Sequence, residues 1–143
     1  MIEHTQTIMG SANPDAVPGN CMQTAVAALL DLPVEKVPHF ILFGNDYDAA
    51  LVMWLRSRGK RLRVYVDDEH HRFAWARAGI NARLLNGAPN GQMMIAVGHS
   101  PNGPWGHTVL WKAGALVWDV HPARAGIVGE PYEFWQVTDA CAI

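Results

Sequence analysis

The stretch GNCMQTAVAALLD, residues 19–31, carries the clearest helical pattern of the chain. Its apolar side chains recur at the three- and four-residue spacing of one helical face. They are Met22, Ala25, Val26, Leu29 and Leu30. Gly19 or Asn20 can cap the start of this helix, and Pro33 forces an end shortly before it. The pattern predicts a helix over 20–31, with Cys21 in its first turn and just outside the apolar stripe.

The patterns that follow this helix predict an α+β fold. Residues 32–40 lie around two prolines and are expected to be irregular, and further helices are expected at 46–58 and 69–79, where glycines mark their ends. Strands are expected at 62–66, 82–85, 93–97, 106–111, 115–120 and 132–137. The continuous apolar run 93–97 is typical of a central strand, and 132–137 is expected at an edge. Helices come first and mostly antiparallel strands last, which favours a single α+β domain over residues 1–143.

Composition and charge exclude several classes of protein. Half of the 143 residues are apolar and 17% are charged, which suits a compact folded chain. The formal net charge of -2 offers no basic field for a phosphate backbone, so no nucleic-acid partner is expected. No apolar run reaches the length of a membrane span, and the N-terminus lacks the basic and apolar regions of a signal peptide. We therefore expect a cytoplasmic protein without a membrane partner, and its two cysteines are poor support for a disulfide.

Cys21 is a candidate nucleophile because of its place at the start of a helix. The unpaired N–H groups and the positive end of the helix dipole favour an anion there. A thiol in such a position has a lowered pKa and a larger fraction of reactive thiolate. The alternative interpretation is that Cys21 is a small buried apolar residue, as lone cysteines often are.

His107 and Asp119 are candidates for the base and for the group that orients it. Residues 112–114 are interpreted as a three-residue loop with Gly114 in the left-handed conformation. In that register His107 directly opposes Asp119, whereas a two-residue loop would place the two on opposite faces. A cysteine hydrolase needs such a pair beside its thiol. Taken singly, His107 could be an ordinary strand residue and Asp119 a turn acid.

Several motifs resemble a known family. They are QTIMG at 6–10, GNCMQTA at 19–25 with LL at 29–30, VPHF at 37–40, HTV at 107–109 and WDVHP at 118–122. In this order they resemble small papain-like cysteine peptidases of phage and bacterial genomes, related to leader-peptide-cleaving cysteine peptidases. The resemblance covers residues 6–126. Within 45–95 no motif matches, and only the order of the expected helices and strands is similar.

The resemblance implies a papain-like fold and a catalytic triad. Cys21 would be the nucleophile, His107 the general base and Asp119 the orienting acid, in a hydrolase (a thiol peptidase, isopeptidase or amidase) that needs no metal or organic cofactor. Gln6 would donate to the oxyanion hole. The wider papain group keeps this glutamine only a few residues before the cysteine, and Asp15 stands there in this chain.

Other interpretations stay open at this point. The run 67–71, Asp-Asp-Glu-His-His, is rich in potential metal ligands but lacks a recognised ligand spacing, so no metal is expected. The fold could serve as a silent binding module, or the same triad could act as a deamidase or transglutaminase on a protein or peptide substrate. Candidates for a substrate cleft are Asn20, Trp105 and His99, of which Trp105 lies in a Gly/Pro-rich loop just before His107.

Overall fold

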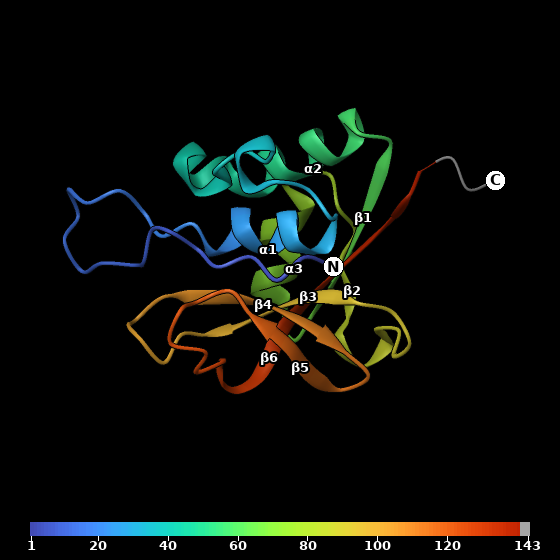
Figure 1. Ribbon diagram of the computed structural model, residues 1–143. Helices are drawn as coiled ribbons and strands as arrows, with labels where there is room; N and C mark the ends of the chain where they lie inside the picture. Colours follow the sequence, from blue (N-terminus) through green and yellow to red (C-terminus); the bar gives the residue numbers. More distant parts are fainter. Residues whose placement is uncertain (141–143) are drawn as a thin grey trace.

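The computed structural model describes residues 1–140, which form one twisted sheet with helices packed on it (Figure 1). The sheet has six strands in the order β2-β1-β6-β3-β4-β5. The strands are β1 (Lys60–Val66), β2 (Arg83–Leu84), β3 (Met94–His99), β4 (Gly106–Lys112), β5 (Ala115–Asp119) and β6 (Val128–Asp139). Only β1 and β2 pair in parallel, and every other neighbouring pair is antiparallel. The predicted α+β class is confirmed, with a mixed sheet.

The helices fall close to their predicted positions. They are α1 (Cys21–Leu29), α2 (Tyr47–Ser57) and α3 (Glu69–Ala76), with 3-10 turns η1 (Val34–Lys36), η2 (Phe40–Asp46) and η3 (Leu85–Gly87). α1 begins at Cys21 with Asn20 as its N-cap and ends at Leu29, one residue later and two residues earlier than the predicted bounds of 20–31. α3 ends before Gly79, because the chain turns at Ala76 and the N–H groups of Ala78 and Gly79 close that turn.

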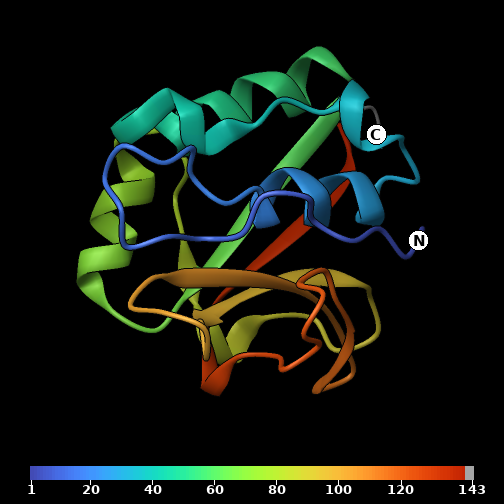
Figure 2. The same cartoon turned by 60° about the vertical axis from the view of Figure 1, so that its left-hand side comes forward.

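α1 occupies the centre of the molecule. It packs on β3 and β4, and η2 covers it from the other side (Figure 2). Its residues Met22, Ala25 and Val26 are buried against Ile95 and Leu110. Full burial of one such large aliphatic side chain contributes about 1.5–3 kcal/mol. The apolar face therefore holds the first turn, and Cys21 with it, firmly against the sheet.

The last strand lies inside the sheet, and the expectation that 132–137 forms an edge is wrong. β6 pairs with β1 on one side and with β3 on the other, so Trp135 lies between Val64 and Ile95. Its polar residues misled the interpretation, because Glu133 and Gln136 are both buried. Each is hydrogen bonded within the core: Glu133 accepts from two indoles and Gln136 accepts from Tyr65.

The hairpin of β4 and β5 has a shorter loop than predicted, and the predicted register is wrong. Lys112 pairs with Ala115 across a two-residue turn, in which Ala113 and Gly114 have φ of 54° and 77°. The register then shifts by one residue near Val117, a β-bulge. Asp119 therefore pairs with Val109. The two-residue loop alone would place Asp119 and His107 on opposite faces of the hairpin. The extra residue at the bulge shifts β5 by one position, so Asp119 lies on the same face as His107 and diagonal to it.

The N-terminal segment folds back along α1. The amide of Gln6 donates to the carbonyl of Val120 at 2.8 Å, just beyond β5. Asn20 holds the same segment, because its Oδ1 accepts from the amides of Thr7 at 3.1 Å and Ile8 at 3.0 Å. The intervening residues project as the long loop visible beside α1 in Figures 1 and 2. This path brings Gln6 back to the start of α1.

Candidate active site

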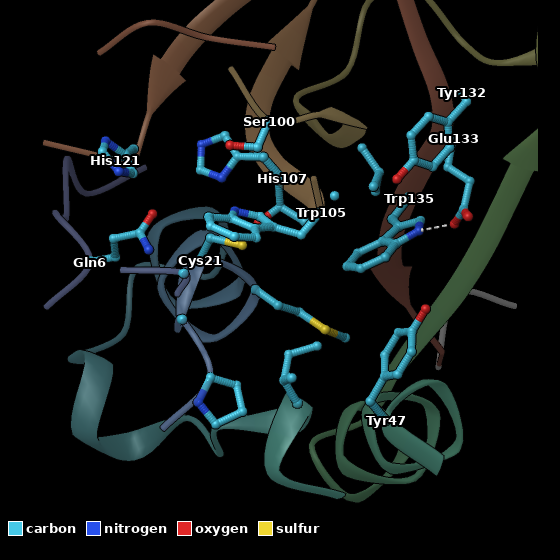
Figure 3. Close-up of a pocket in the computed structure, with 18 of the residues that line it drawn as sticks. Gln6, Cys21, Tyr47, Ser100, Trp105, His107, His121, Tyr132, Glu133 and Trp135 are labelled. Atoms are coloured by element: carbon cyan, nitrogen blue, oxygen red, sulfur yellow. Dashed lines mark hydrogen bonds between the residues drawn. The ribbon is translucent and has the colours of Figure 1, made fainter. Parts of the chain in front are cut away.

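A pocket of about 400 Å³ lies where the start of α1, the start of β4 and the middle of β6 meet (Figure 3). Cys21, His107 and Gln6 all line it. Their elements are far apart in sequence, and they converge because α1 packs directly on β4. The structure thus brings three of the predicted site residues to one cavity.

Cys21 is the first residue of α1 and is partly exposed in the pocket. Burial alone raises the pKa of its thiol, but hydrogen bonding to His107 and the charge of that imidazole outweigh the burial. The net pKa of Cys21 is lowered from its ordinary value. The position at the helix start favours the anion in the same direction.

His107 is buried and joined to Asp119 by a hydrogen bond of 2.6 Å between Nε2 and Oδ1. This bond leaves Nδ1 as the imidazole nitrogen that can serve Cys21. Burial disfavours the charged ring, yet the bond to Asp119 and the contact with Cys21 raise the pKa of His107 to about 9. A lowered thiol pKa beside a raised imidazole pKa favours a thiolate–imidazolium pair near neutral pH.

Asp119 is held in place by backbone donors. Its Oδ1 accepts from the amide of His121 at 3.0 Å, and its Oδ2 accepts from the amide of Gly126 at 2.7 Å. Burial raises the pKa of this carboxyl, but the bond from His107 and the two amide bonds lower it below its ordinary value overall. Arg124 braces the turn by donating to the carbonyls of Asp119 and His121 at 3.0 and 2.6 Å. The carboxylate is therefore ionised and rigidly aimed at His107.

Gln6 reaches the pocket despite its distance from Cys21 in sequence. Its side chain is buried, and Nε2 donates to the carbonyl of Ile8 at 2.8 Å. An amide nitrogen carries two protons, so one remains for a group in the pocket. The Oε1 of Gln6 is buried and has no hydrogen-bond partner among the described residues. Figure 3 shows the amide on the same side of the pocket as His121, with Cys21 beside it.

The three cleft candidates divide. Trp105 lines the pocket, as predicted, but neither Asn20 nor His99 is among the lining residues. Asn20 is a buried anchor whose side chain ties the N-terminal segment to α1. His99 is exposed at the end of β3, where its ring lies 5.2 Å from that of Tyr132. Asn20 is adjacent to Cys21 in sequence and His99 precedes the 100–105 loop, but neither position shows which way the side chain points.

Sequence reasoning missed the far side of the pocket. Tyr47, Tyr132, Glu133 and Trp135 line it, from α2 and β6. The one signal in the sequence is Glu133, the acid within the mostly apolar and aromatic run of a predicted strand. His121, in the WDVHP motif at 118–122, has no predicted role. It also lines the pocket, with its ring 6.0 Å from that of His107.

The metal-ligand run at 67–71 has a structural explanation. Asp67, Asp68 and His71 place their ligand atoms within 4.8 Å of one another. Asp68 is the N-cap of α3, and its side chain accepts from the amide of His71 at 2.9 Å. Both carboxylates also lie beside Nδ1 of His71, at 3.2 and 3.0 Å. Helix capping accounts for this arrangement, and the absence of a metal stays a prediction.

Comparison of the chain with family models, with curated proteins and with solved structures finds no match. None of the helices within residues 1–140 is long and apolar enough to cross a membrane.

Proposed function

We propose that the protein is a papain-like, cysteine-dependent hydrolase that cleaves an amide or related acyl bond through Cys21, His107 and Asp119. The observation that carries this proposal is the 2.6 Å bond from Asp119 to an imidazole that shares a pocket with a low-pKa thiol. A helix bearing the cysteine, packed on antiparallel strands bearing the histidine and the acid, supports the papain-like assignment. The family resemblance rests on the sequence motifs alone.

The proposed reaction has two acyl-transfer steps. The Cys21 thiolate attacks the substrate carbonyl, and the tetrahedral oxyanion collapses to a thioester as the His107 imidazolium protonates the leaving amine. His107 then takes a proton from water, and the resulting hydroxide attacks the thioester. The adduct breaks its C–S bond and expels the Cys21 thiolate, and the acid product departs and releases its own proton to solvent. The thiolate then pairs with the imidazolium that His107 formed when it took the proton from water. Asp119 does not exchange a proton and keeps the imidazole oriented.

The oxyanion would be stabilised by two donors. The backbone N–H of Cys21 belongs to the first turn of α1, where amides have no partner within the helix. The Gln6 amide supplies the second donor from the same pocket. Donors fixed in this way act on charge that develops only in the transition state, and one of them is worth about 10²–10³ in rate.

The proposed chemistry predicts a selective reaction of Cys21 with thiol reagents. At pH 6, iodoacetamide should label Cys21 at least about tenfold faster than Cys141, because a lowered pKa gives Cys21 a larger thiolate fraction than an ordinary thiol has. Cys141 lies outside the described residues, and a Cys141→Ala variant is the matched control. Cys21→Ala should lose all turnover of carbonyl activity probes while keeping its fold. Equal and slow labelling of both thiols would instead favour a silent binding module.

We also propose a cytoplasmic location and a protein or peptide substrate. Both follow from the sequence expectations. Fractionation of expressing cells tests the cytoplasmic location.

The acyl-transferase alternative is tested by adding an amine to the reaction. If the amine captures the acyl group from Cys21 faster than water does, the protein is an acyl transferase that uses the same triad.

A further inference from the structure

The pocket contains a second acidic group that the proposed chemistry does not use. Glu133 lies on β6 and lines the same pocket as Cys21, yet its residue surface is only 6% exposed. Figure 3 shows Glu133, Tyr132, Trp135 and Tyr47 on the side of the pocket opposite Gln6 and His121, with Cys21 between the two sides. A substrate whose carbonyl lies at Cys21 can therefore extend a group toward Glu133.

Glu133 forms no ion pair with any residue of the described part of the chain, 1–140. Its Oε1 accepts from the indole N–H groups of Trp75 and Trp135, both at 2.8 Å. Its Oε2 makes no hydrogen bond within residues 1–140, and no ion pair of that region includes Glu133. Buried carboxylates are normally paired with a cation, because an isolated buried charge is costly. His71 lines the same pocket, and its charge acts to lower the pKa of Glu133, but its ring is held beside Asp67 and Asp68.

Aromatic rings form the walls beside this carboxylate. Tyr47, Tyr132 and Trp135 line the pocket around it, and the ring of His71 stacks on Tyr132 at 5.0 Å. Aromatic faces attract cations through their quadrupole, most strongly where water is excluded. Burial raises the pKa of Glu133 despite the two indole bonds, and a cation beside the carboxylate would favour its ionised form.

We propose that Glu133, with Tyr47, Tyr132 and Trp135, forms a subsite for a cationic substrate group, an ammonium or a guanidinium, next to the reacting carbonyl. The inference rests on the proposed function and names its substrate class: acyl compounds or peptides that carry a lysine-like or arginine-like side chain. Oε2 receives the cation, and the rings enclose the aliphatic stem of the side chain.

Peptidyl ketone inactivators test this subsite on the wild-type protein. The probes carry lysine, arginine, norleucine or glutamate as the first or second residue before the ketone. In one of the two positions, lysine or arginine should inactivate Cys21 at least about tenfold faster than norleucine, and glutamate should be slowest. The lysine and arginine arms separate an ammonium from a guanidinium preference. Equal rates for lysine and norleucine in both positions would overturn the subsite, whatever the behaviour of the variants.

Glu133→Gln separates charge from shape. The glutamine oxygen can still accept from both indoles, so the packing around Trp75 and Trp135 is kept. The ratio of the lysine rate to the norleucine rate, which does not depend on the absolute rate of the variant, should fall to within about threefold. Glu130→Gln, an exposed acid on the same strand, is the matched control and should change neither rate. A full cationic advantage in Glu133→Gln would assign the preference to another acid.

A binding measurement distinguishes failure of the subsite from failure of the proposed function. Calorimetric titration of Cys21→Ala with N-acetyl-lysine amide and N-acetyl-norleucine amide should show at least about fivefold tighter binding of the lysine compound. Selective binding without any ketone labelling of Cys21 would leave the subsite standing and refute the hydrolase. Efficient labelling without a charge preference in either experiment would leave the hydrolase standing and refute the subsite.

Discussion

At the scale of single residues, the protonation of His107 decides when the candidate site is competent. The pKa of His107 is raised to about 9, whereas the pKa values of Cys21 and Asp119 are lowered. The imidazolium is therefore held from neutral pH up to the region of its raised pKa, and it is lost as the pH rises further. The thiolate is lost as the pH falls through the lowered pKa of Cys21. The active ionic pair thus exists in a window whose alkaline limit belongs to His107.

Asp119→Asn should move this alkaline limit downward. An asparagine oxygen can still accept from Nε2, so the ring orientation is largely kept, but the negative charge that favours the imidazolium is gone. Removal of a paired charge shifts a pKa by about 1–3 units. The alkaline limb of kcat/KM should therefore fall from about pH 9 by one unit or more. Asp139→Asn, which alters only the exposed pair with Lys60, should leave the limb in place.

The pH profile of inactivation or turnover measures this shift directly. A limb that stays near pH 9 in Asp119→Asn would mean that a group other than His107 controls it. Loss of activity without any shift would assign Asp119 a purely structural part, which fits its bonds to the amides of His121 and Gly126.

At the scale of elements, the hairpin shows how far sequence patterns reach. The strands could be predicted from the alternation of apolar residues, and the predicted contact between the side chains of His107 and Asp119 is present. The register could not be predicted, because Ala113 adopts a positive φ that alanine rarely takes and Val117 forms a bulge with no sequence signature. The two-residue loop and the bulge offset each other. The contact between His107 and Asp119 is therefore present, although the predicted loop length and register are both wrong. α1 was predictable because packing, Pro33 and local propensity all agree.

The ring of Trp105 lines the pocket and packs closely against Gly10 and Gly103, where no side chain stands in its way. A Cβ on Gly103 would lie 2.1 Å from the Trp105 ring, and one on Gly10 would lie 2.4 Å from it. Gly103→Ala should therefore displace the indole, and repacking of this kind costs about 1–3 kcal/mol. Bulky ketone probes should inactivate Cys21 about tenfold more slowly, whereas small iodoacetamide should react at the wild-type rate.

The ratio of the two labelling rates is the measurement for Gly103→Ala. Gly91→Ala is the control, because a Cβ there meets no atom within 4 Å. If the variant alters neither rate, Trp105 does not border the route of the substrate. If it slows both reagents equally, the change reaches Cys21 itself rather than the wall.

At the scale of the whole molecule, the site depends on the order of the strands in the sheet and on the N-terminal segment that folds back along α1. Local patterns located the strand around 132–137, but they do not encode that β6 inserts between β1 and β3. That insertion carries Glu133 and Trp135 into the pocket, so the sequence could mark Glu133 as an unusual strand residue but could not place it beside Cys21. The return of Gln6 was likewise hidden, because it depends on long-range bonds to Asn20 and Val120. Local propensity fixes elements, whereas such contacts depend on the assembled fold.

Asn20 joins the N-terminal segment to the nucleophile helix, so its loss should affect both stability and activity. Asn20→Ala leaves the amides of Thr7 and Ile8 without their acceptor. Each unsatisfied donor costs about 1–3 kcal/mol, reduced where water can reach it. Urea denaturation should show a loss of about 2–4 kcal/mol in the free energy of unfolding. Because Gln6 belongs to the same segment, kcat should also fall, while iodoacetamide labelling of Cys21 at pH 6 should persist.

The control for this prediction is Asn13→Ala. Asn13 is exposed in the same N-terminal region, and its only side-chain hydrogen bond within residues 1–140 accepts from the amide of Asp15. This variant should change the free energy of unfolding by less than about 0.5 kcal/mol and leave kcat unaltered. If Asn20→Ala destabilises the fold yet keeps the wild-type kcat, then Gln6 is not a donor to the oxyanion and the Cys21 amide acts without it. If kcat falls together with thiol labelling, the start of α1 itself has moved, because a displaced Gln6 alone cannot change the ionisation that His107 imposes on Cys21.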